Sequence, residues 1–222
     1  MGLPRPRAIV LVVAVTAAAL FVAMLVHIPG AFELVGTPLI AAVLVGITVY
    51  VAFVWFVDVR SPSTAEMGAA LGLLAGVLFV GTICVENFVA VPRALNVWVT
   101  LSFMLAIFAS FGAAGYKAYR CGLGTLGGLT ASLIAGATGV LVALNCGFLL
   151  NVVAAPRLLQ NLGTEAAQHH LAPTLAFTAL SSAESAATHL VEAPVIASSS
   201  ARSRSGSIAV GIARATASRG GR

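Results

Sequence analysis

Five long apolar runs dominate the sequence and restrict what the chain can fold into. They cover about residues 8–26, 35–57, 67–85, 97–116 and, after a glycine-rich turn at 122–128, a stretch ending near Ala155. Each run can cross ~30 Å of bilayer hydrocarbon as a helix, whereas a β-barrel needs short alternating segments. Soluble domains carry about a quarter charged residues, but only 9% of this chain is charged and its mean hydropathy is +1.03. The sequence therefore predicts an all-α, polytopic transmembrane helix bundle.

The first run follows Arg5 and Arg7, so its start resembles a signal peptide. The run is longer than a usual signal-peptide core, and no clear cleavage pattern of small residues follows it. We therefore expect an uncleaved first helix.

A sixth segment, Pro173–Pro194, is less apolar and carries a sustained polar stripe. On a helix that turns about 100° per residue, its hydroxyl, acidic and histidine side chains gather on one side. A helix lying on the membrane surface pairs its apolar face with lysines and arginines, but neither occurs between Leu158 and Ala201. We predict that this helix spans the bilayer and faces its own bundle. A surface-lying helix is the alternative.

The basic residues indicate the topology. Six spans place ten of the twelve on one side and only Arg93 and Arg157 on the other, whereas five spans give five against seven. The positive-inside rule therefore favours about six helices with both termini cytoplasmic. We expect residues 1–197 to form the transmembrane domain and residues 198–222 a Ser/Arg/Gly-rich, disordered cytoplasmic tail. The expected location is a bacterial inner (plasma) membrane.

Small residues recur at four-residue spacing in three of the apolar runs. In lipid, helices associate through close van der Waals approach, which small residues at this spacing allow. We predict helix packing inside the chain at these positions, with a dimer interface as the alternative. The residues are Gly68, Gly72 and Gly76 in the third run, Ser102, Ala106, Ser110 and Ala114 in the fourth, and Gly128, Ser132 and Gly136 in the fifth.

The polar stripe of the sixth segment contains the main candidate site. Glu184 lies about eleven residues beyond Pro173, or ~16 Å along the helix, near mid-membrane. An ionised carboxylate at this depth costs several kcal/mol unless it is paired or hydrated. Thr188, His189 and Glu192 follow on the same side, so this file could bind a cation or pass protons. The alternative is that the stripe only packs against polar side chains of other helices.

Two weaker sets of polar residues are predicted near the opposite, outer face. Glu86 and Asn145 could form the outer mouth of a pathway, although solvation at the membrane interface explains Glu86 equally well. A metal site is a weaker hypothesis, because it requires distant loops to meet. Its candidate ligands are His27, Glu165, His169 and His170.

The sequence contains no GxxxxGK[ST], HExxH or GxSxG motif, so it gives no sign of nucleotide hydrolysis or common hydrolase chemistry. We lean against an enzyme and expect no cofactor and no nucleic-acid partner. The leading hypothesis is a membrane protein that binds or transports a small ion or solute, with the lipid bilayer as its surroundings. The alternative is a non-transporting scaffold or sensor subunit whose small-residue faces hold a second copy or another membrane protein.

Overall fold

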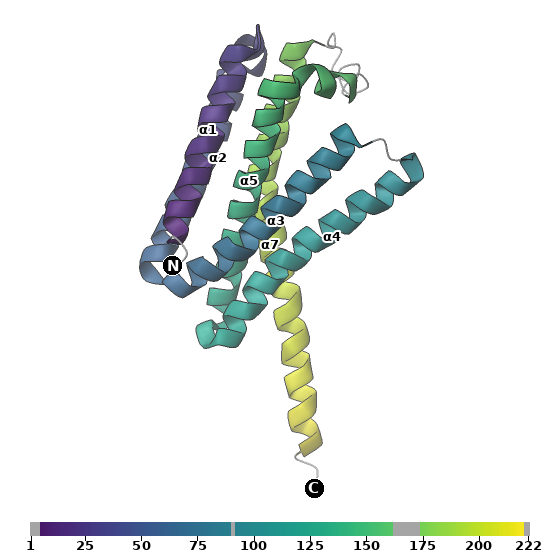
Figure 1. The fold of residues 1–222 in the computed structure, drawn as a ribbon. Coiled ribbons are helices and arrows are strands. Elements are labelled where there is room, and N and C mark those ends of the chain that lie inside the picture. Colours follow the sequence, from purple (N-terminus) through teal and green to yellow (C-terminus); the bar gives the residue numbers. More distant parts are fainter. Residues whose placement is uncertain (1–4, 90–91, 162–173, 220–222) are drawn as a thin grey trace.

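The structure is a computed structural model that describes residues 5–89, 92–161 and 174–219. That part of the chain is helical almost throughout and contains no strand, which confirms the predicted all-α class. Each apolar run lies inside one helix. The elements, shown in Figure 1, are α1 (Pro6–His27), α2 (Ala31–Arg60), α3 (Pro62–Phe88), α4 (Arg93–Ala118), the π-helical turn η1 (Tyr119–Leu123), α5 (Gly124–Asn161) and α7 (Leu175–Arg219).

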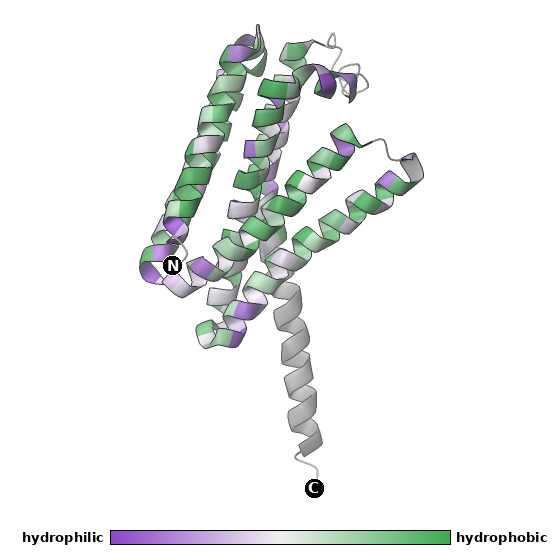
Figure 2. Cartoon of the chain, viewed as in Figure 1, coloured by the Kyte–Doolittle hydropathy of each residue, from purple (hydrophilic) through white to green (hydrophobic). Residues whose placement is uncertain are grey.

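The helices are long and apolar enough for a membrane. Within the described residues α1, α2, α3 and the stretch Leu95–Gln160 satisfy this criterion, and the last stretch contains both α4 and α5. Large apolar side chains are also exposed on the bundle: Val26 is 81% exposed and Leu126 77% exposed. Figure 2 shows that apolar residues predominate along α1 to α5. Four to five apolar helices therefore indicate a multi-pass membrane protein. Because α7 is less apolar, a sixth span stays a prediction.

Two helical hairpins and α5 organise the bundle. α1 and α2 reverse direction at Gly30, whose φ of 75° is readily adopted by glycine. The second hairpin consists of α3 and α4, and α5 packs against α1, α3, α4 and α7. Figure 1 shows the hairpin of α3 and α4 crossing α5 at an angle, so that its loop end leans away from α5.

The glycine stripe of α3 forms the close contact with α5. A Cβ atom added to Gly68 would lie 2.7 Å from the Ala131 carbonyl oxygen, and one added to Gly72 would lie 2.6 Å from Thr138 Cβ. At Gly76 the corresponding distance to Val142 Cβ is 2.5 Å. Only glycine allows two helix backbones to approach this closely.

The small residues of α5 contact α4 in the same way. A Cβ atom added to Gly128 would lie 2.9 Å from the Gly115 carbonyl oxygen. Ser132 Oγ donates a hydrogen bond of 2.9 Å to the Phe111 carbonyl, and Gly136 is buried. The structure thus places these faces in contacts within the chain.

The start of α1 and the end of α2 are joined by an ion pair. Arg7 Nε lies 3.4 Å from Asp58 Oδ2, and the Asp58 side chain is only 6% exposed. The Arg7 guanidinium also lies 5.2 Å from the centre of the Trp55 ring. A buried carboxylate depends on such a partner, because burial removes the water that would otherwise solvate its charge.

A proline explains a hydrogen bond between α2 and α7. Pro194 has no N–H, so it cannot donate to the Leu190 carbonyl one turn earlier in α7. Tyr50 Oη of α2 donates to that carbonyl at 2.6 Å. Gly46 allows the approach, because a Cβ atom there would lie 2.8 Å from Leu190 Cδ1. The tyrosine therefore supplies the donor that the proline removed.

We expect Tyr50→Phe to destabilise the bundle by about 1–2 kcal/mol, because the substitution leaves the Leu190 carbonyl buried without its side-chain donor. In a Pro194→Ala background the helix regains an N–H for this carbonyl, so Tyr50→Phe should cost clearly less. Denaturant titration of the four variants in mixed micelles measures both costs. Equal costs in the two backgrounds would contradict this explanation of the hydrogen bond.

The last helix continues beyond the predicted end of the transmembrane domain. We predicted disorder from Ser198 onward, whereas α7 runs as a helix to Arg219. The side chains from Ser199 onward lie outside the described set. The division into two domains and the role of the tail therefore stay predictions.

Candidate functional site

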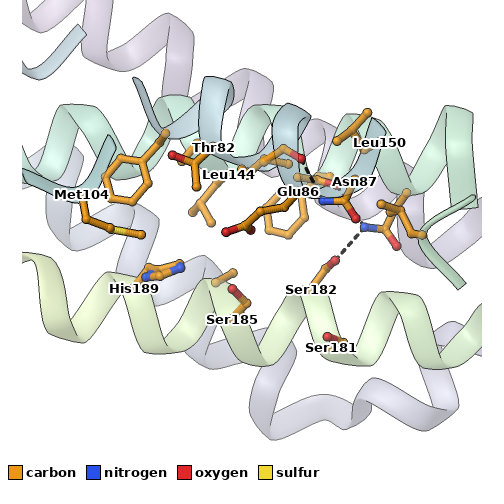
Figure 3. Close-up of a pocket in the computed structure, with 18 residues that line it drawn as sticks. Thr82, Glu86, Asn87, Met104, Leu144, Leu150, Ser181, Ser182, Ser185 and His189 are labelled. Carbon is orange, nitrogen blue, oxygen red and sulfur yellow. Dashed lines mark hydrogen bonds between the residues drawn. The ribbon is translucent and has the colours of Figure 1, made fainter. Parts of the chain in front are cut away.

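A cavity of about 430 Å³ lies where α3 leans away from α5, and α7 closes it from the side. Its size falls within the usual range of small-molecule sites, about 300–1,000 Å³. Polar side chains from three helices converge on it (Figure 3). They are Thr82, Glu86 and Asn87 of α3, Asn151 of α5, and Ser181, Ser182, Ser185 and His189 of α7.

The change in residue size along α3 explains where the cavity forms. Gly68, Gly72 and Gly76 allow contact with α5, but Phe79 follows within the next turn and lines the cavity. Further along, Gly81 packs against α4, because a Cβ atom there would lie 2.9 Å from Phe103 Cε1. α3 therefore remains close to α4 while it separates from α5.

Glu86 provides a carboxylate at the wide end of the cavity. Its side chain is exposed, and Oε1 accepts a hydrogen bond of 3.1 Å from Thr100 Oγ1 of α4. Figure 3 shows the carboxylate between α3 and α7, with Ser185 and His189 on the opposite wall. The half-buried His189 ring lies beside Phe79, with 6.0 Å between ring centres. The cavity thus has an acidic group on one wall and an imidazole on the other.

Asn151 of α5 is 1% exposed and joins the cavity wall to α7. Its Nδ2 donates to the Gly147 carbonyl at 3.0 Å and to Ser182 Oγ at 2.6 Å. Among the described residues its Oδ1 has no hydrogen-bond partner. Our sequence analysis did not select Asn151. The sequence did contain a signal for it: Asn151 is an amide inside an apolar run, and a polar group in a membrane is costly unless it has a role.

The structure brings together only some of the predicted pathway residues. Glu86 and His189 both line the cavity. Glu184, Thr188 and Glu192 do not line it; Glu184 is half-buried, and Thr188 and Glu192 are exposed. Glu184 lies about 140° around α7 from His189, whereas Glu192 has nearly the same angular position as Ser181 and Ser185 but lies further along the helix. The structure therefore does not place the file from Glu184 to Glu192 in this cavity.

Asn145, the other predicted pathway residue, faces α1 and does not line the cavity. Its Nδ2 donates to the carbonyls of Val13 and Leu141, each at 2.8 Å. Asn145 and Asn151 are six residues apart and therefore about 120° apart around the helix, so they lie on different faces of α5. The predicted mouth of Glu86 with Asn145 is therefore not formed, and Glu86 shares the cavity with Asn151.

The weaker metal hypothesis falls mostly outside the described residues. Glu165, His169 and His170 lie in the segment 162–173, which the structure does not describe. His27 is exposed in the last turn of α1. Over the described ranges, no group of three or more His, Cys, Asp or Glu residues is placed to hold a metal ion.

The cavity combines two kinds of wall. One carboxylate, one imidazole, amides and hydroxyl groups lie among apolar side chains that include Phe79, Leu144 and Phe148. Such a lining can orient the polar end of a small molecule while it desolvates an apolar part. No protein-family model, curated protein or solved structure matches this chain.

Proposed function

We propose that this protein binds a small solute in the cavity between α3, α5 and α7 and transports it across the membrane. The supporting observation is the convergence of polar groups from three helices on one cavity within an apolar bundle. Polar and ionisable groups inside a membrane are costly, which supports a functional role for such a cluster. The cavity replaces the Glu184 file as the centre of our transport hypothesis.

The proposal treats α7 as a sixth span, with both termini cytoplasmic in a bacterial inner membrane. Its support is the packing of α7 against α2, α4 and α5. Phe177, Ala179, Ala183 and Ala186 of α7 are buried against other helices. A helix lying alone on the membrane surface would not bury this face.

The scaffold hypothesis is the alternative function. It relied on small-residue faces to hold a partner, but Gly68, Gly72 and Gly76 contact α5 of the same chain. The exposed polar side of α7, with Thr188 and Glu192, gives a different reason to consider a partner. Inside a bilayer such groups meet water or protein, so a subunit of a larger assembly is the second candidate function.

Transport is tested by blocking the cavity. Proteoliposomes containing the full chain are placed in gradients of choline, betaine or ribitol, which are a cation, a zwitterion and a neutral solute. We expect flux of at least one probe above that of protein-free vesicles. Ser185→Trp places a large ring at the cavity wall and should lower this flux at least tenfold.

The matched control is Thr188→Trp, which adds the same ring to α7 outside the cavity lining. This variant should retain wild-type flux. Absence of flux for all three probes, or equal loss in both tryptophan variants, would refute transport through this cavity.

A further inference from the structure

The cavity contains hydrogen-bond acceptor sites that the described structure does not use. Glu86 brings a carboxylate to the lining, and among its described bonds it accepts one hydrogen bond, from Thr100 Oγ1. A carboxylate can accept about four hydrogen bonds, so a ligand with N–H donors could bind to the remaining sites. Asn151 Oδ1 also has no described partner, but it is fully buried, so we do not assign it to a ligand in the cavity.

The charge of the cavity also favours a cation. Among the described lining residues there is no lysine or arginine to neutralise Glu86. Arg157 contacts the backbone of a lining residue: its Nε donates to the Asn87 carbonyl at 3.3 Å, and its Nη1 donates to Gln160 Oε1 at 2.9 Å. Its described hydrogen bonds therefore go to groups other than the Glu86 carboxylate. A cationic ligand would supply the missing counter-charge.

The apolar walls favour an organic cation over a metal ion. A hard cation such as Ca²⁺ needs six to eight oxygen ligands, whereas half of the residues around this cavity have apolar side chains. Phe79 and Phe148 are among them, and aromatic rings attract ammonium groups. The same walls can desolvate a hydrocarbon or aromatic body attached to the charged group.

We infer that the cavity binds a primary amine in its ammonium form, with an attached apolar group. The ammonium N–H groups point toward the Glu86 carboxylate, and the apolar group lies against Phe79. This inference rests on the proposed function, because it names the ligand class of the same cavity.

The test uses phenethylammonium as the probe and the full chain in detergent micelles, with calorimetric titration corrected for empty micelles. Three comparison compounds change one property each. 2-Phenylethanol is neutral, 3-phenylpropanoate is anionic, and N,N,N-trimethylphenethylammonium keeps the charge but has no N–H donor. We expect phenethylammonium to bind at least tenfold more tightly than any of them.

Two variants locate the effect. Glu86→Gln should weaken binding of phenethylammonium at least tenfold, because it removes the negative charge that pairs with the ammonium group. Glu86 is exposed, so the substitution should leave the fold intact. Glu66→Gln removes an exposed carboxylate near the other end of α3, outside the cavity lining, and should change binding less than twofold. Equal weakening in both variants would overturn the assignment to Glu86.

The outcomes separate this inference from the proposed function. If 2-phenylethanol or 3-phenylpropanoate bound more tightly than phenethylammonium, and Ser185→Trp abolished this binding, the ammonium ligand would be wrong but the cavity would still be a binding site. If N,N,N-trimethylphenethylammonium bound as tightly as phenethylammonium, the proposed N–H contacts would be wrong. Binding of none of the compounds would overturn the inference, whereas the flux measurement decides on transport independently.

Discussion

Gly72→Ala should destabilise the bundle by about 3 kcal/mol, which is large for the addition of one methyl group. The added Cβ would lie 2.6 Å from Thr138 Cβ, 2.7 Å from the Ala135 carbonyl oxygen and 3.0 Å from Ala135 Cα. Two of these atoms belong to the α5 backbone and cannot rotate away. The helices must therefore separate, and contacts along the whole α3–α5 interface weaken.

A matched control separates this clash from the effect of glycine on helix formation. Gly147→Ala makes the same substitution in α5, where an added Cβ meets nothing within 4 Å. Alanine favours the helix over glycine by up to about 1 kcal/mol, so this variant should be neutral or slightly more stable. Denaturant titration in mixed micelles compares the two. Similar stability changes in both would show that the α3–α5 contact is not as close as described.

Arg7→Met should also destabilise the protein by about 3 kcal/mol, because it leaves the carboxylate of Asp58 buried without its partner. Asp58 is 6% exposed, and its closest described cation is Arg7 Nε at 3.4 Å. Arg7 itself is 29% exposed, so we place the cost at the lower end of the range for buried pairs. Adding Asp58→Asn removes the orphaned charge and should recover most of the lost stability.

Arg60→Met is the control for the loss of one cation at the same end of the hairpin. The Arg60 guanidinium lies 4.0 Å from the centre of the Phe56 ring, and Arg60 is exposed. Its replacement should cost less than about 1 kcal/mol. A double variant no more stable than Arg7→Met alone would show that Asp58 does not depend on this partner.

Hydropathy predicted the apolar helices well, because hydrocarbon imposes a minimum length and excludes charge. The spacing of Gly68, Gly72 and Gly76 likewise indicated a face for close helix contact, and the structure places that face on α5. The partner helix was not predictable. Spacing identifies the face of one helix, whereas the choice of neighbour depends on how all the helices fit together.

The candidate site was harder to predict for a geometric reason. A polar stripe several residues wide does not show which of its edges faces a cavity, and Glu184 and His189 fall on different edges of α7. Asn151 and Glu86 come from helices far apart in the sequence, and they line one cavity only because α3 leans away from α5. That angle depends on the glycine contacts and on Phe79, whose combined effect no local pattern reveals.

The three glycine contacts of α3 also limit how the cavity can change its width. Sliding α3 along α5 would push Thr138 and Val142 out of the positions opposite Gly72 and Gly76 and against larger side chains. Rotation of α3 about the glycine contacts would preserve this register. A small change in the angle between α3 and α5 would therefore displace the far end of α3, where Glu86 lies, more than the region of the contacts.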